Sequence, residues 1–156
     1  MGVYDRILVP TDGSAEVERA VDHALELASV HDASVHTLYV VSTKTFTGLP
    51  MESSWESVDQ FLREDAEEAV ERVRELAATS SIDVTTAIAE GKPSREIVRY
   101  AEREGCDVVV MGTHGRGGID RLLLGSVAET VVRSSSVPVV TVNVHEETTD
   151  TPPRRI

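Results

Sequence analysis

Short apolar runs alternate along the chain with longer stretches in which apolar residues recur every three or four positions. The short runs predict buried strands at 7–9, 35–41, 84–89, 107–111 and 138–144. The spacing of three and four predicts amphipathic helices between them, beginning near Ser14, Ser53, Pro93 and Ser126. Strands that alternate with helices form parallel sheets covered on both faces. We therefore predict one doubly wound α/β domain over residues 1–145, followed by a polar, disordered tail at 146–156.

The predicted helix ends carry recognisable signals. Pro93 suits a first helical turn and Gly105 a helix end. Three helix starts carry a serine that can cap them: Ser14 alone, and Ser53–Glu56 and Ser126–Glu129 as capping boxes. Phe61 belongs to the apolar stripe of the second helix, so we expect it to pack beneath that helix.

The stretch from Gly112 to Ser126 carries the strongest chemical signal. Gly112 and Gly115 follow a predicted strand, and Gly125-Ser126 precedes a predicted helix. Glycines allow the backbone to approach a ligand closely, and a helix N-terminus presents unpaired N–H groups that suit phosphate. Ligands of such sheets bind beyond the carboxyl ends of the strands, where the winding reverses. If the first and fourth strands are neighbours, the turn at 10–14 faces this stretch across one crevice.

The net charge of the chain bears on its environment and on the molecules that it can bind. The chain has 27 acidic and 15 basic residues, a net charge of -12, and Lys44 and Lys92 are its only lysines. This composition suits a surface that stays soluble at high salt, so we expect a halophilic protein. Nucleic acid is not an expected partner, because it requires clustered Lys and Arg. No signal peptide or membrane-spanning run is apparent, so we expect a cytoplasmic protein with no membrane contact.

Other glycine motifs do not match. A Walker A loop needs a lysine that is absent after Lys92. The Gly115-Arg116-Gly117 segment has Asp120 where a dinucleotide fingerprint needs its third glycine. The nucleophile elbow of a hydrolase fails because Leu124 replaces its first glycine. No Cys or His cluster indicates zinc, and we predict no catalytic residue.

The spacing of Gly112, Gly115 and Gly125-Ser126 resembles the nucleotide-binding motif of the universal stress protein family. Similarity to that family extends over residues 3–144 and includes the opening Ile7-to-Ser14 segment, Gly91-Lys92-Pro93 and the closing 136–142 segment. The resemblance implies strand order 3-2-1-4-5 and the ATP-binding branch. It also implies a homodimer paired through the fifth strand, with Val139, Val140, Val142 and Val144.

The resemblance also implies a set of site residues. Asp12 would lie near the ribose and a Mg²⁺ ion, in the turn that contains Pro10 and Thr11, and Val40 would line the adenine pocket. The ribose and phosphate contacts would come from Met111, Gly112, His114, Gly115, Gly125, Ser126 and Val127. Arg116 flanks this loop and could neutralise phosphate.

Several alternatives remain open from the residues. Asp12 could serve only as a turn or cap residue, His114 could be a plain surface histidine, and Ser126 could act only as a cap. The expected function is that of an ATP-binding regulator or sensor in the stress response. A slow ATPase with His114 as its only loop candidate, a binder of AMP or cyclic AMP, and a nucleotide-free dimeric scaffold are the alternatives.

Overall fold

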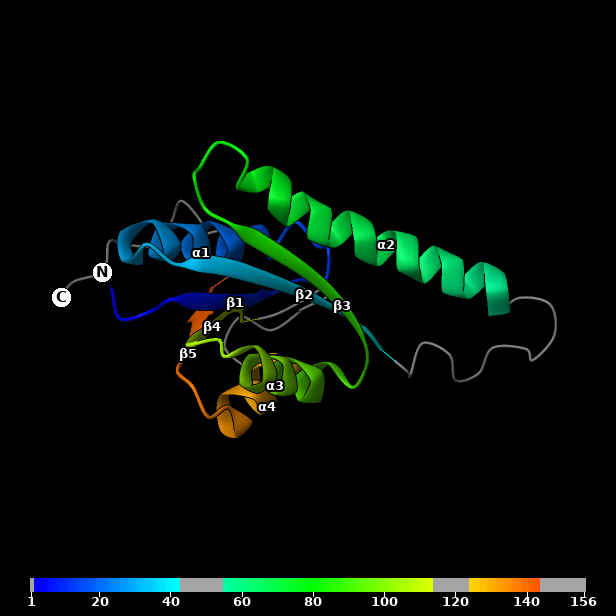
Figure 1. Cartoon of the computed structure of the whole chain (residues 1–156). Helices are drawn as coiled ribbons and strands as arrows, with labels where there is room; N and C mark the ends of the chain where they lie inside the picture. Colours follow the sequence, from blue (N-terminus) through cyan, green and yellow to red (C-terminus); the bar gives the residue numbers. More distant parts are fainter. Residues whose placement is uncertain (1, 43–54, 114–123, 144–156) are drawn as a thin grey trace, which may run out of the picture.

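The computed structural model describes residues 2–42, 55–113 and 124–143. The elements follow the chain as β1 (Arg6–Pro10), α1 (Glu18–His31), β2 (Ser34–Ser42), α2 (Trp55–Leu76), β3 (Val84–Gly91), α3 (Pro93–Glu104), β4 (Val108–Gly112), α4 (Ser126–Ser134) and β5 (Val139–Val142). The strands form one parallel sheet in the order β3-β2-β1-β4-β5 (Figure 1). This confirms the predicted fold class and strand order.

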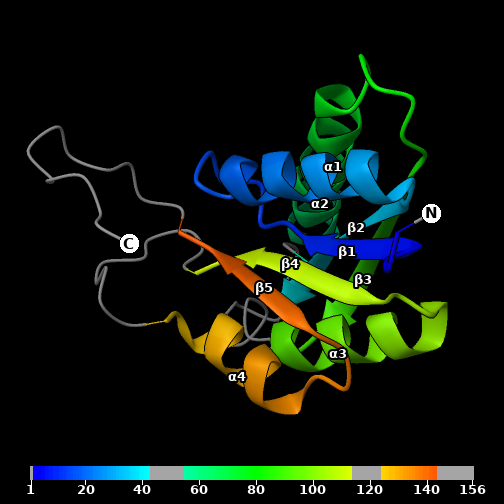
Figure 2. The same cartoon turned by 90° about the vertical axis from the view of Figure 1, so that its left-hand side faces the viewer.

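The helices cover both faces of the sheet. Helices α1 and α2 lie on one face, and α3 and α4 lie on the other (Figures 1 and 2). Side chains of a strand alternate between faces, so Ile7 and Val9 join the core beneath α1, while Leu8 joins the core beneath α3 and α4. Burial on both faces explains why β1 and β4 appear in the sequence as continuous apolar runs. The outer strands β3 and β5 are only partly buried.

The ends of α3 agree with the sequence signals. Pro93 occupies the first turn, and Gly105 ends the helix in the left-handed conformation with φ 67°. The fifth strand is shorter than predicted and ends at Val142. Val144 and the tail at 146–156 lie outside the described residues. No helix in the described part of the chain is long and apolar enough to cross a membrane.

Two predicted serine caps are wrong. Helix α1 begins at Glu18 with Val17 at the N-cap and no side-chain cap, so Ser14 lies upstream of the helix. Helix α4 has Gly125 at its N-cap, and Ser126 is already the first helical residue. The Ser53–Glu56 capping box involves residues outside the described part of the chain.

Phe61 also departs from its predicted place. Its side chain is 68% exposed instead of packing beneath α2. Four and seven residues further along the helix, the same side carries Asp65 and Glu68. Phe61 therefore lies on the charged side of α2.

Candidate functional site

The unequal lengths of the central strands create a hollow at one edge of the sheet. Strand β1 ends at Pro10 opposite Leu38, but β2 continues to Ser42. Those four further residues extend about 13 Å beyond the end of β1. The chain leaves β1 toward α1 and leaves β4 toward α4, which cover opposite faces. The space between the two connections is therefore left open, as expected where the winding of a parallel sheet reverses.

A pocket of about 610 Å³ occupies this position. Nine of the twelve predicted site residues line it: Pro10, Thr11, Asp12, Val40, Met111, Gly112, Gly125, Ser126 and Val127. The other three, His114, Gly115 and Arg116, lie outside the described residues. The two connections that the sequence singled out thus come together around one cavity of the size typical for small-molecule sites.

The pocket has an apolar side and a polar side. Leu38 and Val40 of β2 face Ile97 of α3 in one apolar cluster, and all three line the pocket. The opposite side carries Thr11, Asp12, Thr113 and Ser126, which follow β1 and β4. A ligand with one flat apolar part and one charged part fits this division.

The N-terminus of α4 forms part of the polar side. The N–H of Gly125 donates to the carbonyl of Thr113 at 2.7 Å, and the N–H of Glu129 donates to the carbonyl of Gly125 at 2.9 Å. Helix geometry leaves the N–H groups of residues 126–128 without an intrahelical carbonyl. Ser126, Val127 and Ala128 all line the pocket. The positive end of the helix dipole therefore meets the pocket, which favours an anionic group there.

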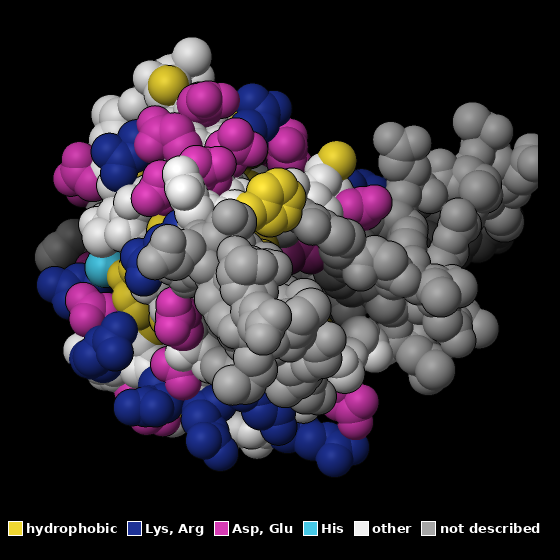
Figure 3. All heavy atoms as spheres, turned by 90° about the vertical axis from the view of Figure 1, so that its right-hand side faces the viewer, with side chains coloured by type: hydrophobic (Ala, Val, Ile, Leu, Met, Phe, Trp, Pro, Cys, Tyr) yellow, Lys and Arg dark blue, Asp and Glu magenta, His cyan; other side chains and the backbone are white. Residues whose placement is uncertain are grey.

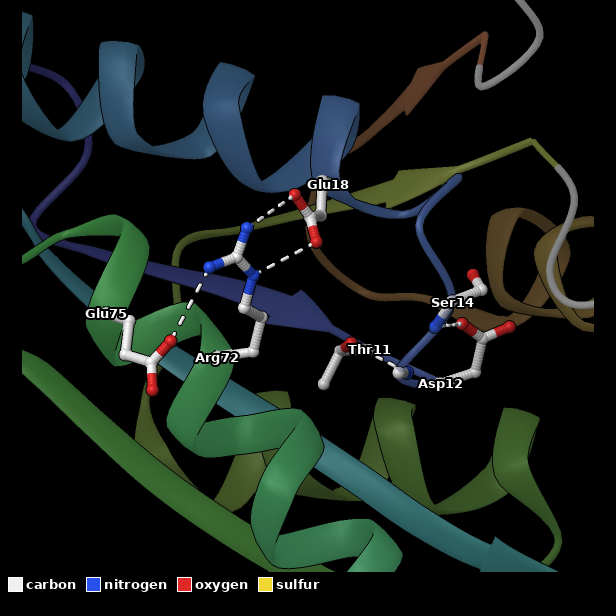
Figure 4. A network of polar contacts seen from close by, with 7 residues as sticks. Thr11, Asp12, Ser14, Glu18, Arg72 and Glu75 are labelled. Carbon is white, nitrogen blue, oxygen red and sulfur yellow. Dashed lines mark hydrogen bonds and ion pairs between the residues drawn. The ribbon is translucent and has the colours of Figure 1, made fainter.

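The turn after β1 is closed by its own side chains. Asp12 Oδ1 accepts a hydrogen bond from the N–H of Ser14 at 2.9 Å, and Thr11 Oγ1 accepts one from the N–H of Gly13 at 3.1 Å (Figure 4). Gly13 has φ 79°, a left-handed conformation that favours glycine. Ser14 Oγ is buried and has no hydrogen-bond partner among the described residues. Asp12 is therefore both a turn acceptor and a carboxylate at the pocket wall.

The described part of the pocket wall offers one carboxylate, that of Asp12, which suits a cation held mainly by the bound small molecule and by water. Within the described residues, no three His, Cys, Asp or Glu side chains gather into a metal-binding group. Mg²⁺ commonly takes one or two carboxylates together with substrate phosphates and water. Asp12 fits that pattern as a single protein ligand.

Charge is distributed unevenly between the helices on the two faces of the sheet. Helix α2 carries eight acidic and three basic residues, whereas α3 carries three of each. Figure 3 looks onto the side at which β2 ends; acidic side chains gather in the upper part of this face, and Lys and Arg side chains follow its lower edge together with a few acidic ones. The described ion pairs of α3 and α4 are local to each helix, such as Arg99–Glu96 at 3.6 Å and Arg133–Glu129 at 2.8 Å.

Sequence reasoning missed seven lining residues, which are Val17, Leu38, Ser42, Pro93, Ile97, Thr113 and Ala128. Leu38, Ser42, Thr113 and Ala128 each lie within two positions of a predicted site residue in the chain. Pro93 and Ile97 carry a separate signal, because the start of the helix after β3 also lies near the carboxyl edge of the sheet. Applying the carboxyl-edge rule to all the strands would have found them.

A second polar group lies beneath α3 and does not line the pocket. His36 Nδ1 is 2.8 Å from the Tyr100 hydroxyl, and both side chains are buried. Burial, followed by the charge of Arg6, lowers the pKa of His36, although Glu104 opposes this. Burial raises the pKa of Tyr100 to about 12 and that of the Cys106 thiol to about 11. These groups therefore stay neutral near pH 7, in agreement with a structural role.

Comparison with known protein families gives a match over nearly the whole described chain. The model of the universal stress protein family matches residues 3–143. Universal stress protein MJ0531 of Methanocaldococcus jannaschii is 42% identical over 140 residues, covering 90% of this chain and 82% of that protein.

Solved structures agree with this match. The structure of MJ0577, a universal stress protein of the same organism, has a TM-score of 0.81 and 31% identity, and the match covers 93% of this chain and 99% of that one. A universal stress protein solved in complex with cAMP has a TM-score of 0.66 and 26% identity, covering 91% and 98% of the two chains.

Proposed function

Since this chain belongs to the universal stress protein family, we propose that its pocket binds ATP with Mg²⁺. We further propose that the protein acts as a nucleotide-dependent regulator or sensor in the stress response. The observation that carries the proposal is the division of the pocket between the apolar Leu38, Val40 and Ile97 and the open N-terminus of α4. An adenine base suits the first part, and phosphates suit the second. The related protein in complex with cAMP supports an adenine nucleotide as the ligand class.

Mg²⁺ would offset the charge of the phosphates in a chain whose own net charge is -12. Asp12 would supply one carboxylate oxygen, and the phosphates and water would supply the other ligands. We assign no catalytic residue to the pocket, so binding and release of nucleotide, rather than turnover, would change the state of the protein.

We also propose that two copies associate through β5. This strand lies at the edge of the sheet, with Thr141 exposed and its valines partly buried against the core. Exposed edge strands readily pair with a second chain. Sedimentation should give twice the chain mass of 16.9 kDa, and Thr141→Asp should weaken the association by placing like charges across the pairing. A wild-type monomer at micromolar concentration would contradict the dimer.

Calorimetric titration with ATP, AMP and cyclic AMP, with and without Mg²⁺, tests the proposed ligand. Gly125→Val is the informative variant, because the φ of -61° and ψ of 157° at Gly125 are accessible to any residue. The backbone therefore accepts valine, whose side chain enters the pocket wall beside the helix N-terminus. Val132→Thr, on the exposed side of α4, is the control.

We expect Gly125→Val to lose at least tenfold in ATP affinity, while Val132→Thr matches the wild type. Tighter binding of AMP or cyclic AMP than of ATP would replace the proposed ligand with that nucleotide. Absence of binding by the wild type to all three nucleotides would leave the dimeric scaffold as the better account.

A further inference from the structure

One ion pair joins α2 to the first residue of α1. Arg72 Nε lies 3.1 Å from Glu18 Oε2, and Arg72 Nη2 lies 3.3 Å from Glu18 Oε1 (Figure 4). The third guanidinium nitrogen, Nη1, lies 3.5 Å from Glu75 on the same helix. The guanidinium thus binds Glu18 through two nitrogens, which fixes orientation as well as distance. This contact joins residues 54 positions apart in the sequence.

Apolar packing is incomplete where this pair forms. A cavity of about 10 Å³ lies at the seam between α1 and α2, and its lining includes Ser14, Val17, Arg72 and Val73. The buried Ser14 hydroxyl, which has no partner among the described residues, belongs to the same lining. The ion pair therefore adds a directional link beside a small packing defect between two helices that also share apolar contacts through Val21 and Val73.

The Arg72–Glu18 ion pair connects α2, which packs on the sheet, to the segment that forms one wall of the pocket. Helix α2 is anchored by Ala66, Ala69, Val70 and Val73, which are buried. Arg72 extends from this anchored helix to Glu18, whose N–H donates to the carbonyl of Ala15 at 3.2 Å. The turn immediately upstream contains Thr11 and Asp12, which line the pocket. A displacement of Glu18 would consequently be passed to one wall of the pocket.

We propose that Arg72 is a positioning residue for the nucleotide pocket: through Glu18 it holds the turn at residues 11–14 in its binding arrangement. The part of this inference that concerns affinity rests on the proposed function. The part that concerns the turn does not, because the ion pair and the turn hydrogen bonds exist without a ligand. The same contact would transmit nucleotide binding in the opposite direction, from the turn to α2, since coupling between two sites is reciprocal.

A double-mutant cycle separates the two parts. The variants are Arg72→Gln, Glu18→Gln and the double variant, with Arg74→Gln as the control. Arg74 lies on the same helix, is equally exposed at 52%, and pairs instead with Glu71 at 3.6 Å. The first readout is hydrogen exchange of the Gly13 and Ser14 amides without nucleotide, because both donate to side chains of the turn. The second readout is ATP affinity by calorimetry.

We expect each single variant at the pair to speed exchange at both amides and to weaken ATP binding by about two- to fivefold, the scale of a partly exposed pair. The double variant should be no worse than either single variant, and Arg74→Gln should match the wild type. Exchange in Arg72→Gln equal to that in Arg74→Gln would overturn the proposal, as would additive losses in the double variant. If Arg72→Gln speeds exchange at the two amides but the wild type binds no ATP, then Arg72 positions the turn and the proposed ligand is wrong.

Discussion

Replacing Ser14 by alanine distinguishes two accounts of the turn after β1. If Ser14 capped α1, as its sequence context suggests, the variant would lose about 0.5–2 kcal/mol of unfolding free energy. In the structure the helix begins at Glu18, and Ser14 Oγ is buried without a partner among the described residues. An unpaired buried hydroxyl costs about 1–3 kcal/mol. Its removal should therefore leave stability unchanged or raise it by about 1 kcal/mol, because the slightly larger cavity offsets part of the gain.

A hydroxyl three positions earlier provides the matched control. Thr11 Oγ1 accepts a hydrogen bond from the N–H of Gly13 at 3.1 Å, so Thr11→Val should lose about 0.5–1.5 kcal/mol. Urea unfolding followed by circular dichroism gives both values, and thermal unfolding should show a rise of up to about 4 °C for Ser14→Ala. A loss of 1 kcal/mol or more in Ser14→Ala would refute this reading of the turn.

Other buried and exposed groups give further predictions. Burial lowers the folded-state pKa of His36 below its unfolded value of 6.5. The contribution of the neutral His36 side chain to the free energy of unfolding is therefore complete above pH 6.5 and decreases as the pH falls below 6.5. The stability difference between wild type and His36→Gln should therefore shift in favour of the variant between pH 7.5 and 5, and a constant difference would contradict this. The Cys106 thiol, with a pKa of about 11, should react with an aromatic disulfide reagent at pH 8 at least about 100-fold more slowly in the folded than in the unfolded chain, whose thiol has an ordinary pKa. Equal rates would show an accessible thiol. Phe61→Ser should change stability by no more than about 0.5 kcal/mol, whereas a loss of about 3 kcal/mol would indicate that the ring is buried.

The sequence predicted the central strands well because β1 and β4 are buried on both faces. Runs such as Val108–Val110 have no polar side to interrupt them, and the helices between show the spacing of a single buried face. Strand order and the position of the pocket followed from the family resemblance together with the rule for the carboxyl edge of parallel sheets.

The helix starts were less predictable. A serine followed three residues later by glutamate occurs at 126–129, but Ser126 is one position inside the helix, and Glu129 pairs with Arg133 at 2.8 Å. Local sequence does not show whether Ser126 is the N-cap or the first helical residue, because the start of the helix depends on the hydrogen bonds of the backbone before it. The N–H of Gly125 donates to the carbonyl of Thr113, which is twelve positions away in the sequence.

The depth of the pocket was also beyond sequence reasoning. It depends on β2 extending four residues past the end of β1. The predicted strands at 7–9 and 35–41 already differ in length, but the register that places Pro10 opposite Leu38 is a pairing of distant segments, which periodicity does not specify. The same overhang explains why Ser42, at the end of β2, was not among the predicted lining residues.

We propose that the open N-terminus of α4 binds the phosphates of ATP and that Asp12, in the turn after β1, holds the accompanying Mg²⁺. Amide chemical shifts recorded while ATP and Mg²⁺ are titrated into ¹⁵N-labelled protein test it most directly. The largest changes should fall on Ser126, Val127 and Ala128, which line the pocket, and on Gly13, next to Asp12 in the turn, with little change at His36 and Tyr100, which do not line the pocket. Unchanged shifts at residues 126–128 at saturating ATP would contradict the claim.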